Sequence, residues 1–394
     1  MKRILFKSGH LGFGGVERVQ TEYMNYLYSV NADFKVVLDK DLAEQNVMAA
    51  HLKCPVVYLK KNNDVLELED ARANKNKSFL YKIKYNLALN KDRKLTKTGF
   101  SKIVNDFKPE IAINFHDLYY FDLDVLKNAK TILWVHSALI SPWRNLEKGL
   151  KYLKKMSKYD LIVCVSKEIM EQIIELRPEL KNKTTYLYNP VNFERIEKLS
   201  NEEFSDTVVG AYCNTPLQNK KYLLMVSRLD WGKDFEALFQ GFEIAKEKGY
   251  DGELYVIGEG ENKDKQKIIE LLEKNKFKSN IHLLGAKTNP FNWMKKCDKF
   301  ILSSKFEGLP TVLIEALTVN DTVISSNCKT GPIEILENGK IGYLFTVGDS
   351  EELARLILEA KPKDRNLIDD SLQRFDKRNI MKEFEEIISN ERII

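Results

Sequence analysis

Two glutamates, Glu307 and Glu315, are the residues of this chain whose type and spacing point most directly to chemistry. Seven residues separate them in the stretch 303–316, SSKFEGLPTVLIEA. The apolar run at 299–302 predicts a buried strand, and Pro310 favours the first turn of a helix, where its missing N–H would have no partner anyway. Glu307 is therefore expected on a loop between the carboxyl end of a strand and a helix N-terminus, where ligands bind in open α/β sheets. Helix-start N–H groups suit a phosphate, and a carboxylate suits sugar hydroxyls.

The same two glutamates also fit a plain solvated helix face, because acidic residues are frequent in this chain. Apolar residues flank Glu315 on both sides, and a carboxylate in such a run needs a hydrogen-bonding partner. That context favours a binding role over the solvated face.

Two cations, Arg228 and Lys233, follow another apolar run at 222–227 and enclose Gly232. The pattern predicts a strand-to-helix loop. Two cations on such a loop suit a diphosphate, because arginine presents a fork of donors and lysine a point charge. Exposed cations are common on loops, so this pair gains meaning only beside the glutamates downstream.

A glycine-rich turn opens the chain between a predicted strand at 3–8 and a predicted helix at 16–28. Its last two glycines, Gly14 and Gly15, either let the backbone approach a phosphate or a sugar closely or form a plain tight turn. The dinucleotide pattern G-x-G-x-x-G is incomplete, because its third glycine would fall on Glu17.

Together these segments resemble the retaining glycosyltransferases of the GT-B fold in glycosyltransferase family four, the glycosyl transferases group 1. The string FEGLPTVLIEA is similar to the E-x7-E segment of that family. The resemblance assigns the hydroxyls of the donor sugar to Glu307 and the ribose of the nucleotide to Glu315. Arg228 and Lys233 match the R-x4-K pair, which implies contact with the donor diphosphate.

The resemblance also covers the first half of the chain. It implies that Gly14 and Gly15 face the donor diphosphate and the acceptor, and that Glu17 binds the acceptor. His136 ends a predicted strand at 131–135, and the family has a histidine in a matching place close to the donor sugar and its phosphates. A lone histidine is otherwise a satisfied structural residue. The other donor-binding positions implied are Gly258, Gly285, Lys287, Gly308, Leu309 and Thr311.

The alternation of strands and helices restarts at 222, which predicts two α/β domains in a chain of 394 residues. The resemblance implies the GT-B fold, with two Rossmann-like domains facing an interdomain cleft. We expect an acceptor-binding domain at 1–190, a nucleotide-sugar-binding domain at 191–375, and a C-terminal helix at 376–394 that returns to the first domain. Residues 193–219 are predicted to be polar and irregular.

The function that the resemblance implies is transfer of a sugar from a nucleotide donor, expected to be UDP-linked, with retention at the anomeric carbon. The acceptor would be a glycan or glycolipid in the synthesis of bacterial lipopolysaccharide or capsule. The family needs no cofactor and no divalent metal. Asp122 and Asp124 have the spacing of a metal-binding Asp-x-Asp motif, but they follow no predicted strand and instead fit a loop or the start of a helix.

Three other classes of protein remain open. A nucleotide-sugar epimerase can use a similar two-domain fold, and a catalytically silent subunit would bind nucleotide sugar without turning it over. A dehydrogenase would use Asp39, which follows a predicted strand at 34–38, to bind the ribose of a nicotinamide dinucleotide.

The composition predicts a cytoplasmic globular protein, with 43% apolar and 30% charged residues. No apolar run approaches the roughly 18 residues of a membrane span. The run after Lys2 and Arg3 is too short for a signal peptide. The five cysteines are scattered without a C-x-x-C pair, so neither a zinc site nor a disulfide framework is indicated.

Charge is divided unevenly along the chain. Residues 1–190 hold 32 Lys and Arg against 22 Asp and Glu, a net charge of +10, and the remainder has a net charge of −5. Basic residues gather at 75–97, beside Phe79 and two tyrosines, and again at 144–158. Such a stretch is either a solvated face or a helix on an anionic membrane surface, at the inner face of the membrane. No nucleic-acid motif accompanies the charge, so nucleic acid is not an expected partner.

Overall fold

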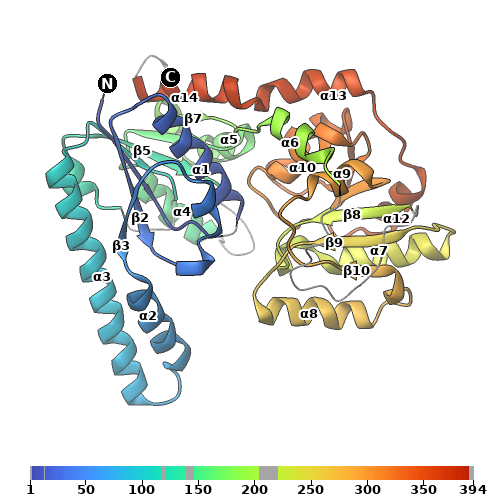
Figure 1. Cartoon of the computed structure of the whole chain (residues 1–394), viewed down its shortest axis with the longest axis horizontal. Coiled ribbons are helices and arrows are strands. Elements are labelled where there is room, and N and C mark those ends of the chain that lie inside the picture. Colours follow the sequence, from blue (N-terminus) through green and yellow to red (C-terminus); the bar gives the residue numbers. More distant parts are fainter. Residues whose placement is uncertain (1, 13, 117–120, 139–145, 204–220, 390–394) are drawn as a thin grey trace. The chain divides into compact units, whose positions relative to one another are not determined.

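The computed structural model describes residues 2–12, 14–116, 121–138, 146–203 and 221–389. These residues form two compact units (Figure 1). Unit 1 comprises residues 1–187 and 381–394, and unit 2 comprises residues 188–380.

Unit 1 is built, in its described part, on a seven-stranded parallel sheet with the strand order β3-β2-β1-β4-β5-β6-β7. Strands β1, β4 and β6 are buried along their whole length, as expected for parallel strands with both faces covered. The order reverses between β1 and β4, which are neighbours in the sheet although β2 and β3 lie between them in sequence. The strands are β1 (Ile4–Ser8), β2 (Phe34–Lys40), β3 (Val56–Lys60), β4 (Ile111–Asn114), β5 (Lys130–Val135), β6 (Leu161–Cys164) and β7 (Thr184–Tyr186).

Aromatic side chains pack the last helix of the chain, α14 (Lys377–Ser389), against unit 1. The ring of Phe384 lies 4.8 Å from that of Tyr23 and 5.9 Å from that of Trp134. Tyr23 comes from α1 (Gly15–Ser29) and Trp134 from β5. Each such aromatic pair contributes about 0.5–1.5 kcal/mol beyond its buried area, which holds the later turns of α14 on this unit.

A long helical hairpin leaves the sheet of unit 1 (Figure 1). It consists of α2 (Asn62–Asn74) and the 29-residue helix α3 (Phe79–Phe107). The hydroxyl of Ser78 caps α3 by accepting from the backbone N–H of Tyr81 at 3.5 Å. The end of α3 is anchored, since Phe100 and Val104 belong to a hydrophobic cluster that also contains residues of β1, β2 and β4.

Two further α-helices lie in the described part of unit 1. They are α4 (Leu146–Met156), which lies within the basic stretch predicted at 144–158, and α5 (Lys167–Leu176). No helix in the described ranges is long and apolar enough to cross a membrane.

Unit 2 has, among its described residues, a six-stranded parallel sheet with the order β10-β9-β8-β11-β12-β13. Its strands are β8 (Tyr222–Val226), β9 (Glu253–Ile257), β10 (Ile281–Leu283), β11 (Lys299–Leu302), β12 (Val323–Ser326) and β13 (Tyr343–Phe345). Here too the order reverses once, between β8 and β11. The helices are α6 (Phe193–Ser200), α7 (Phe235–Glu247), α8 (Asn262–Glu273), α9 (Phe291–Lys296), α10 (Thr311–Val319), α11 (Pro332–Ile335), α12 (Ser350–Glu359) and α13 (Arg365–Leu372).

The structure corrects the prediction of an irregular segment at 193–219 in its first part. Residues 193–200 form α6, whose N-terminus is capped by the side chain of Asn192 accepting from the N–H of Arg195 at 3.0 Å. The cap and the apolar spacing of Phe193, Ile196 and Leu199 are local signals that the polar composition obscured. Residues 204–219 lie outside the described part of the chain.

Candidate functional site

The topology of unit 2 brings two loops together that are far apart in sequence. Strands β8 and β11 are neighbours and parallel, so the loops that follow them leave the same edge of the sheet. This is the point at which the strand order reverses, where open α/β sheets bind ligands. The backbone N–H of Lys305 donates to the carbonyl of Gly232 at 2.8 Å and fastens the two loops to each other.

An ion pair joins these loops at the sequence-predicted residues. The Nζ of Lys233 lies 2.5 Å from Oε1 of Glu307, and the two side chains are 14% and 13% exposed. The hydroxyl of Ser304 also donates to Oε1 of Glu307 at 2.6 Å, and that of Thr330 donates to the Glu307 backbone carbonyl. The hydroxyl of Ser303 donates to the carbonyl of Lys233 at 2.7 Å. The Glu307 carboxylate is thus held by Lys233 and Ser304, while Ser303 and Thr330 hold the backbone of the two loops.

Glycines let the loop after β9 pack directly on the loop after β8. A Cβ on Gly258 would lie 1.7 Å from the carbonyl oxygen of Ser227, and one on Gly260 would lie 2.1 Å from that of Leu229. The N–H of Gly258 donates to the carbonyl of Gly285 at 3.0 Å, so the loop after β10 joins the same edge. No residue with a side chain fits at the first two positions without moving the backbone. Gly258 and Gly285, two of the predicted donor-binding glycines, therefore lie together at this edge of the sheet.

Arg228 occupies a different environment from Lys233. Its side chain is 64% exposed, and its guanidinium lies 3.5 Å from Oδ2 of Asp230. The structure therefore does not bring Arg228 into the Lys233–Glu307 pair, although all three residues lie on loops at one edge of the sheet. Lys287 also stands apart from the pair, with its Nζ 5.9 Å from the ring centre of Trp293, and partial burial lowers its pKa.

The second predicted glutamate lies one turn into α10. Helix α10 begins at Thr311, directly after Pro310, so the predicted helix start is confirmed to within one residue. Glu315 is only 8% exposed in the helix, while Leu309 on the preceding loop is 7% exposed. Gly308 belongs to the same loop, and a Cβ on Gly331 would lie 2.9 Å from the Gly308 carbonyl.

Three of the five histidines gather at the carboxyl edge of the unit 1 sheet. His10 follows β1, His116 follows β4 and His136 follows β5, three adjacent strands. Burial lowers the pKa of His136 to about 4, and its Nε2–H donates to the carbonyl of Phe115 at 2.7 Å. Burial, followed by repulsion from His136 and His10, lowers the pKa of His116 to about 3. At neutral pH these two imidazoles are uncharged and act as hydrogen-bonding groups rather than cations.

The sequence reasoning singled out His136 and missed His116. The signal that could have found it is positional, because each of the three histidines comes one or two residues after a strand of a parallel sheet. The carboxyl ends of such strands meet at one edge.

The side chain of Glu17 lies against the glycine turn at Gly14 and Gly15. A Cβ on Gly14 would lie 2.1 Å from Oε2 of Glu17, while one on Gly15 would meet no atom within 4 Å. Glu17 is 8% exposed, and its Oε1 lies 3.6 Å from Nδ1 of His10. The carboxylate that was expected to face an acceptor therefore folds back over its own loop in this structure.

The side chain of Asp39 is committed to a buried ionic network, which argues against the dehydrogenase alternative. Its oxygens lie 3.4 Å from Nζ of Lys7 and 2.7 Å from Nζ of Lys60, and the Asp39 side chain is 5% exposed. Lys60 also lies 2.9 Å from Asp92 of α3. Burial lowers the pKa of Lys7 to about 8, against the opposing effect of Asp39. An aspartate held by two lysines is not available for a ribose.

Asp122 serves as a helix cap, as the sequence indicated. Its Oδ1 accepts from the backbone N–H of Asp124 at 3.0 Å, ahead of the short helix Leu123–Leu126. Within the described residues, no group of three His, Cys, Asp or Glu side chains is arranged to hold a metal ion.

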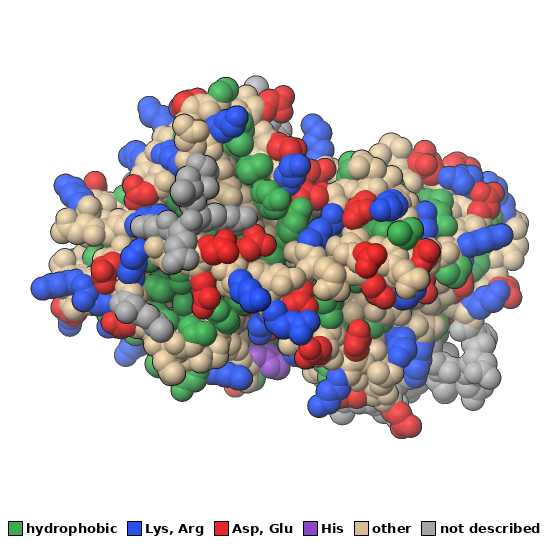
Figure 2. Space-filling view, turned by 90° about the horizontal axis from the view of Figure 1, so that it is seen from above, with side chains coloured by type: hydrophobic (Ala, Val, Ile, Leu, Met, Phe, Trp, Pro, Cys, Tyr) green, Lys and Arg blue, Asp and Glu red, His purple; other side chains and the backbone are tan. Residues whose placement is uncertain are grey.

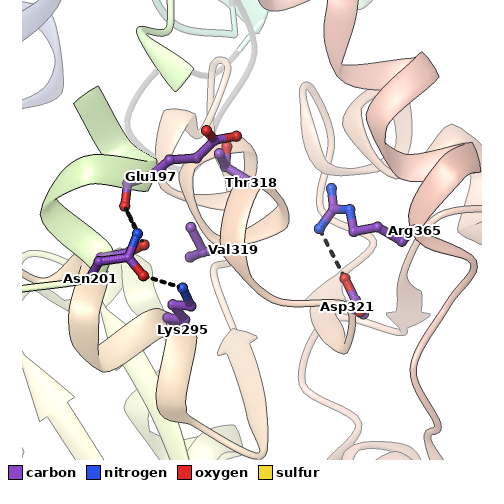
Figure 3. Close-up of a pocket in the computed structure, with 8 residues that line it drawn as sticks. Glu197, Asn201, Lys295, Thr318, Val319, Asp321 and Arg365 are labelled. Carbon is purple, nitrogen blue, oxygen red and sulfur yellow. Dashed lines mark hydrogen bonds and ion pairs between the residues drawn. The ribbon is translucent and has the colours of Figure 1, made fainter. Parts of the chain in front are cut away.

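A separate pocket of about 400 Å³ lies in unit 2 (Figure 3). Asp321 precedes β12 and Lys295 precedes β11, which places the pocket toward the amino ends of these strands, away from Glu307. Its polar groups bind one another, as Lys295 donates to Asn201 at 2.6 Å and Arg365 to Asp321 at 2.9 Å (Figure 3). We therefore place the candidate site at the carboxyl edge and not in this pocket.

Comparison with known proteins agrees with this geometry. Residues 214–379 match the family model of the glycosyl transferases group 1. An uncharacterized glycosyltransferase of Methanocaldococcus jannaschii is 33% identical over 252 residues, which are 60% of each chain. A Campylobacter jejuni protein, N-acetylgalactosamine-N,N'-diacetylbacillosaminyl-diphospho-undecaprenol 4-alpha-N-acetylgalactosaminyltransferase, is 29% identical over 196 residues, 50% of this chain and 49% of its own. The alignments thus span about half to three fifths of these curated relatives.

A solved structure extends the likeness over both units. Anabaena HepE, in complex with UDP and glucose, has a TM-score of 0.71 at 17% identity, covering 99% of this chain and 100% of HepE. The fold class predicted from the sequence is confirmed. The segment 214–379 is therefore assigned to the glycosyl transferases group 1, glycosyltransferase family four, and the two parallel α/β sheets have the GT-B fold.

Proposed function

We propose that this protein transfers a sugar from a nucleotide-sugar donor, UDP-linked, to a glycan or lipid-linked glycan acceptor with retention at the anomeric carbon. The observation that carries the proposal is the Lys233–Glu307 pair at the carboxyl edge of β8 and β11. It sets one preorganised cation and one sugar-binding carboxylate side by side at the strand-order reversal of the unit.

When the bond between the anomeric carbon of the sugar and the phosphate oxygen breaks, negative charge develops on the leaving nucleoside diphosphate. Lys233 and Arg228 stabilise that charge, the first as a largely buried ammonium and the second as an exposed guanidinium. No side chain is assigned as a nucleophile. The reaction proceeds on one face of the sugar, and the leaving phosphate takes the proton of the acceptor hydroxyl.

Donor recognition divides between the two glutamates in this proposal. Glu307 accepts hydrogen bonds from sugar hydroxyls, exchanging its contact with Lys233 for contacts with the donor. Glu315, one turn into α10, binds the ribose. The backbone around Gly258 and Gly285 holds the base and the phosphates, with Lys287 beside it. The remaining donor contacts come from Gly308, Leu309 and the helix-start N–H of Thr311.

For unit 1 we propose the roles that the family resemblance implies. His136, a neutral imidazole at pH 7, acts on the donor sugar and its phosphates, and Gly14 and Gly15 face the diphosphate and the acceptor. Glu17 binds the acceptor after releasing His10, its partner at 3.6 Å. The Campylobacter jejuni relative is named for transfer to a diphospho-undecaprenol-linked sugar. We propose that class of acceptor here, in bacterial lipopolysaccharide or capsule synthesis.

A screen of nucleotide sugars tests the proposal. Each candidate donor is added to the protein, and the thermal midpoint and the release of free nucleotide are measured. A donor at 100 times its Kd should stabilise the protein by about 2.7 kcal/mol. Slow UDP release from one UDP-sugar, accelerated by an acceptor and giving the retained anomer by NMR, is the expected result.

The alternatives give different results in the same screen. An epimerase would isomerise the donor sugar without any acceptor and release no UDP. A silent subunit would be stabilised by a nucleotide sugar and never release UDP. Stabilisation by a nicotinamide dinucleotide alone would contradict the proposal.

A further inference from the structure

The distal part of the α2–α3 hairpin carries an uncovered apolar stripe. On α3 the side chains of Phe79, Leu80 and Leu87 are 77%, 75% and 65% exposed, and Ile83 is 42% exposed. At 100° per residue, these four positions fall within an arc of about 100° on one side of the helix. Isolated exposed apolar residues need no explanation, but a continuous stripe on one helix marks an interaction surface. We call these four residues the apolar stripe.

Helix α2 packs on a side of α3 that differs from the side carrying the apolar stripe. Nζ of Lys91 lies 2.6 Å from Glu67 of α2, and Nζ of Lys84 lies 3.7 Å from Asp70. On the helical wheel, both lysines lie beyond one edge of the apolar stripe, turned toward α2. The buried residue Ala88 lies farther round on that same side. The stripe is therefore not left open by a poorly packed hairpin.

Basic residues outnumber acidic ones around the apolar stripe, although Lys84 and Lys91 are paired with Asp70 and Glu67 of α2. Residues 75–97 contain one acid, Asp92, and that carboxylate is already paired with Lys60 at 2.9 Å. On the face of the molecule in Figure 2, by contrast, acidic and basic side chains are interspersed. The basic residues of the segment are Lys75, Lys77, Lys82, Lys84, Lys91, Arg93, Lys94 and Lys97.

The half of α3 nearer the sheet is anchored on unit 1. Lys60, at the end of β3, pairs with Asp92 in the middle of α3, and Phe100 and Val104 pack into the core beyond it. The 29 residues of α3 span about 43 Å at 1.5 Å per residue, and the apolar stripe occupies the end remote from that core. The stripe therefore lies at the end of the hairpin that is away from the sheet.

We propose that the apolar stripe docks this protein on an anionic lipid bilayer. An apolar helix face with lysines along its margins is the arrangement that lies in a membrane interface, with apolar side chains among the acyl chains and ammonium groups at the phosphates. A second copy of the chain is a poor occupant, because two-fold pairing of the stripes would set lysine margins against each other. The inference concerns binding alone and does not depend on glycosyl transfer.

Vesicle flotation of the full chain tests the proposal. The probes are vesicles of phosphatidylcholine alone and vesicles with about one third phosphatidylglycerol, each at low salt and at 1 M NaCl. We expect binding to the anionic vesicles at low salt only, because 1 M salt shortens the Debye length from about 10 Å to about 3 Å. No binding to anionic vesicles at low salt would overturn the proposal.

Two sets of variants separate the apolar and the electrostatic parts. Phe79→Ser with Leu80→Ser should weaken binding by about tenfold or more per residue, whereas the same change at the exposed Leu358 and Leu367 of unit 2 should have no effect. Replacing four hairpin lysines by glutamine should weaken it by up to about fivefold per lysine. The four are Lys75, Lys77, Lys82 and Lys84, and the matched control set is Lys263, Lys267, Lys274 and Lys278 of unit 2.

Circular dichroism checks that each variant is folded. Unchanged flotation of both hairpin variants would overturn the proposal. So would self-association in analytical ultracentrifugation that disappears in the serine variant while vesicles bind neither protein, since that result would assign the stripe to a second copy.

Discussion

Replacing Lys233 by methionine separates the structural from the catalytic role of the Lys233–Glu307 pair. Methionine keeps much of the apolar stem and removes the ammonium that lies 2.5 Å from the carboxylate. Breaking a fully buried pair costs about 3–5 kcal/mol, and breaking an exposed pair about 0–1 kcal/mol. Exposed fractions of 14% and 13% place this pair near the buried limit, and Ser304 still donates to the orphaned carboxylate. We therefore expect a loss of about 2–4 kcal/mol in the free energy of unfolding.

Arg228→Met is the matched control. The Arg228 side chain is 64% exposed and its partner Asp230 is 3.5 Å away, so the variant should change the free energy of unfolding by less than about 1 kcal/mol. Both variants should nevertheless lower kcat by about 10²–10³, because each removes one cation from the leaving diphosphate. Stability thus distinguishes the two variants, and activity does not.

Urea unfolding and UDP release on the same preparations provide the two measurements. A third variant, Lys233→Met with Glu307→Gln, removes both charges and should recover much of the stability lost in the single variant. If Lys233→Met unfolds like the wild type, the ion pair is not formed in solution and the reasoning fails. Near-normal kcat in folded Lys233→Met and Arg228→Met would remove both from the catalytic machinery.

Three further predictions concern other residues that the sequence analysis singled out. Glu307→Ala should weaken binding of the nucleotide sugar more than binding of free UDP, and Glu315→Ala should weaken binding of both. Calorimetry with the two ligands measures these effects. Equal weakening of both ligands by Glu307→Ala would contradict the assignment of the sugar to Glu307 and the ribose to Glu315. Activity should survive EDTA, since the spacing candidate Asp122 is used as a helix cap, and strict dependence on added Mn²⁺ or Mg²⁺ would contradict this. Between pH 6.5 and about 4 the unfolded chain protonates His136 and the folded chain does not, so stability falls as the pH falls. The free energy of unfolding, measured with urea, should therefore depend less on pH in His136→Asn than in the wild type, by up to about 1.4 kcal/mol per pH unit between pH 6 and 5. An unchanged pH dependence would be evidence against a neutral imidazole at position 136.

The elements that carry the site could be predicted from the sequence because their signals are local. The apolar run Lys299–Leu302 is β11 itself, and Pro310 marks the start of α10 to within one residue. The helix α6 was missed at Phe193–Ser200, where a short amphipathic pattern behind an asparagine cap lies in a polar region. Periodicity and caps depend on neighbours within a few residues, so they can be read without knowing the fold.

The local sequence pattern could not predict which strands and loops become neighbours in the fold. Lys233 and Glu307 are 74 residues apart, and they meet only because β11 returns to pair with β8 after β9 and β10 have been added on its other side. The same reversal in unit 1 brings His10, after β1, beside His116, after β4, and tertiary burial turns Asp39 from a ligand candidate into a partner of Lys7. Strand order is decided by the packing of whole helices on the two faces of a sheet. The sequence therefore showed which residue types could form the site. Their pairing, their burial and the resulting shifts in pKa depend on contacts that only the folded chain makes.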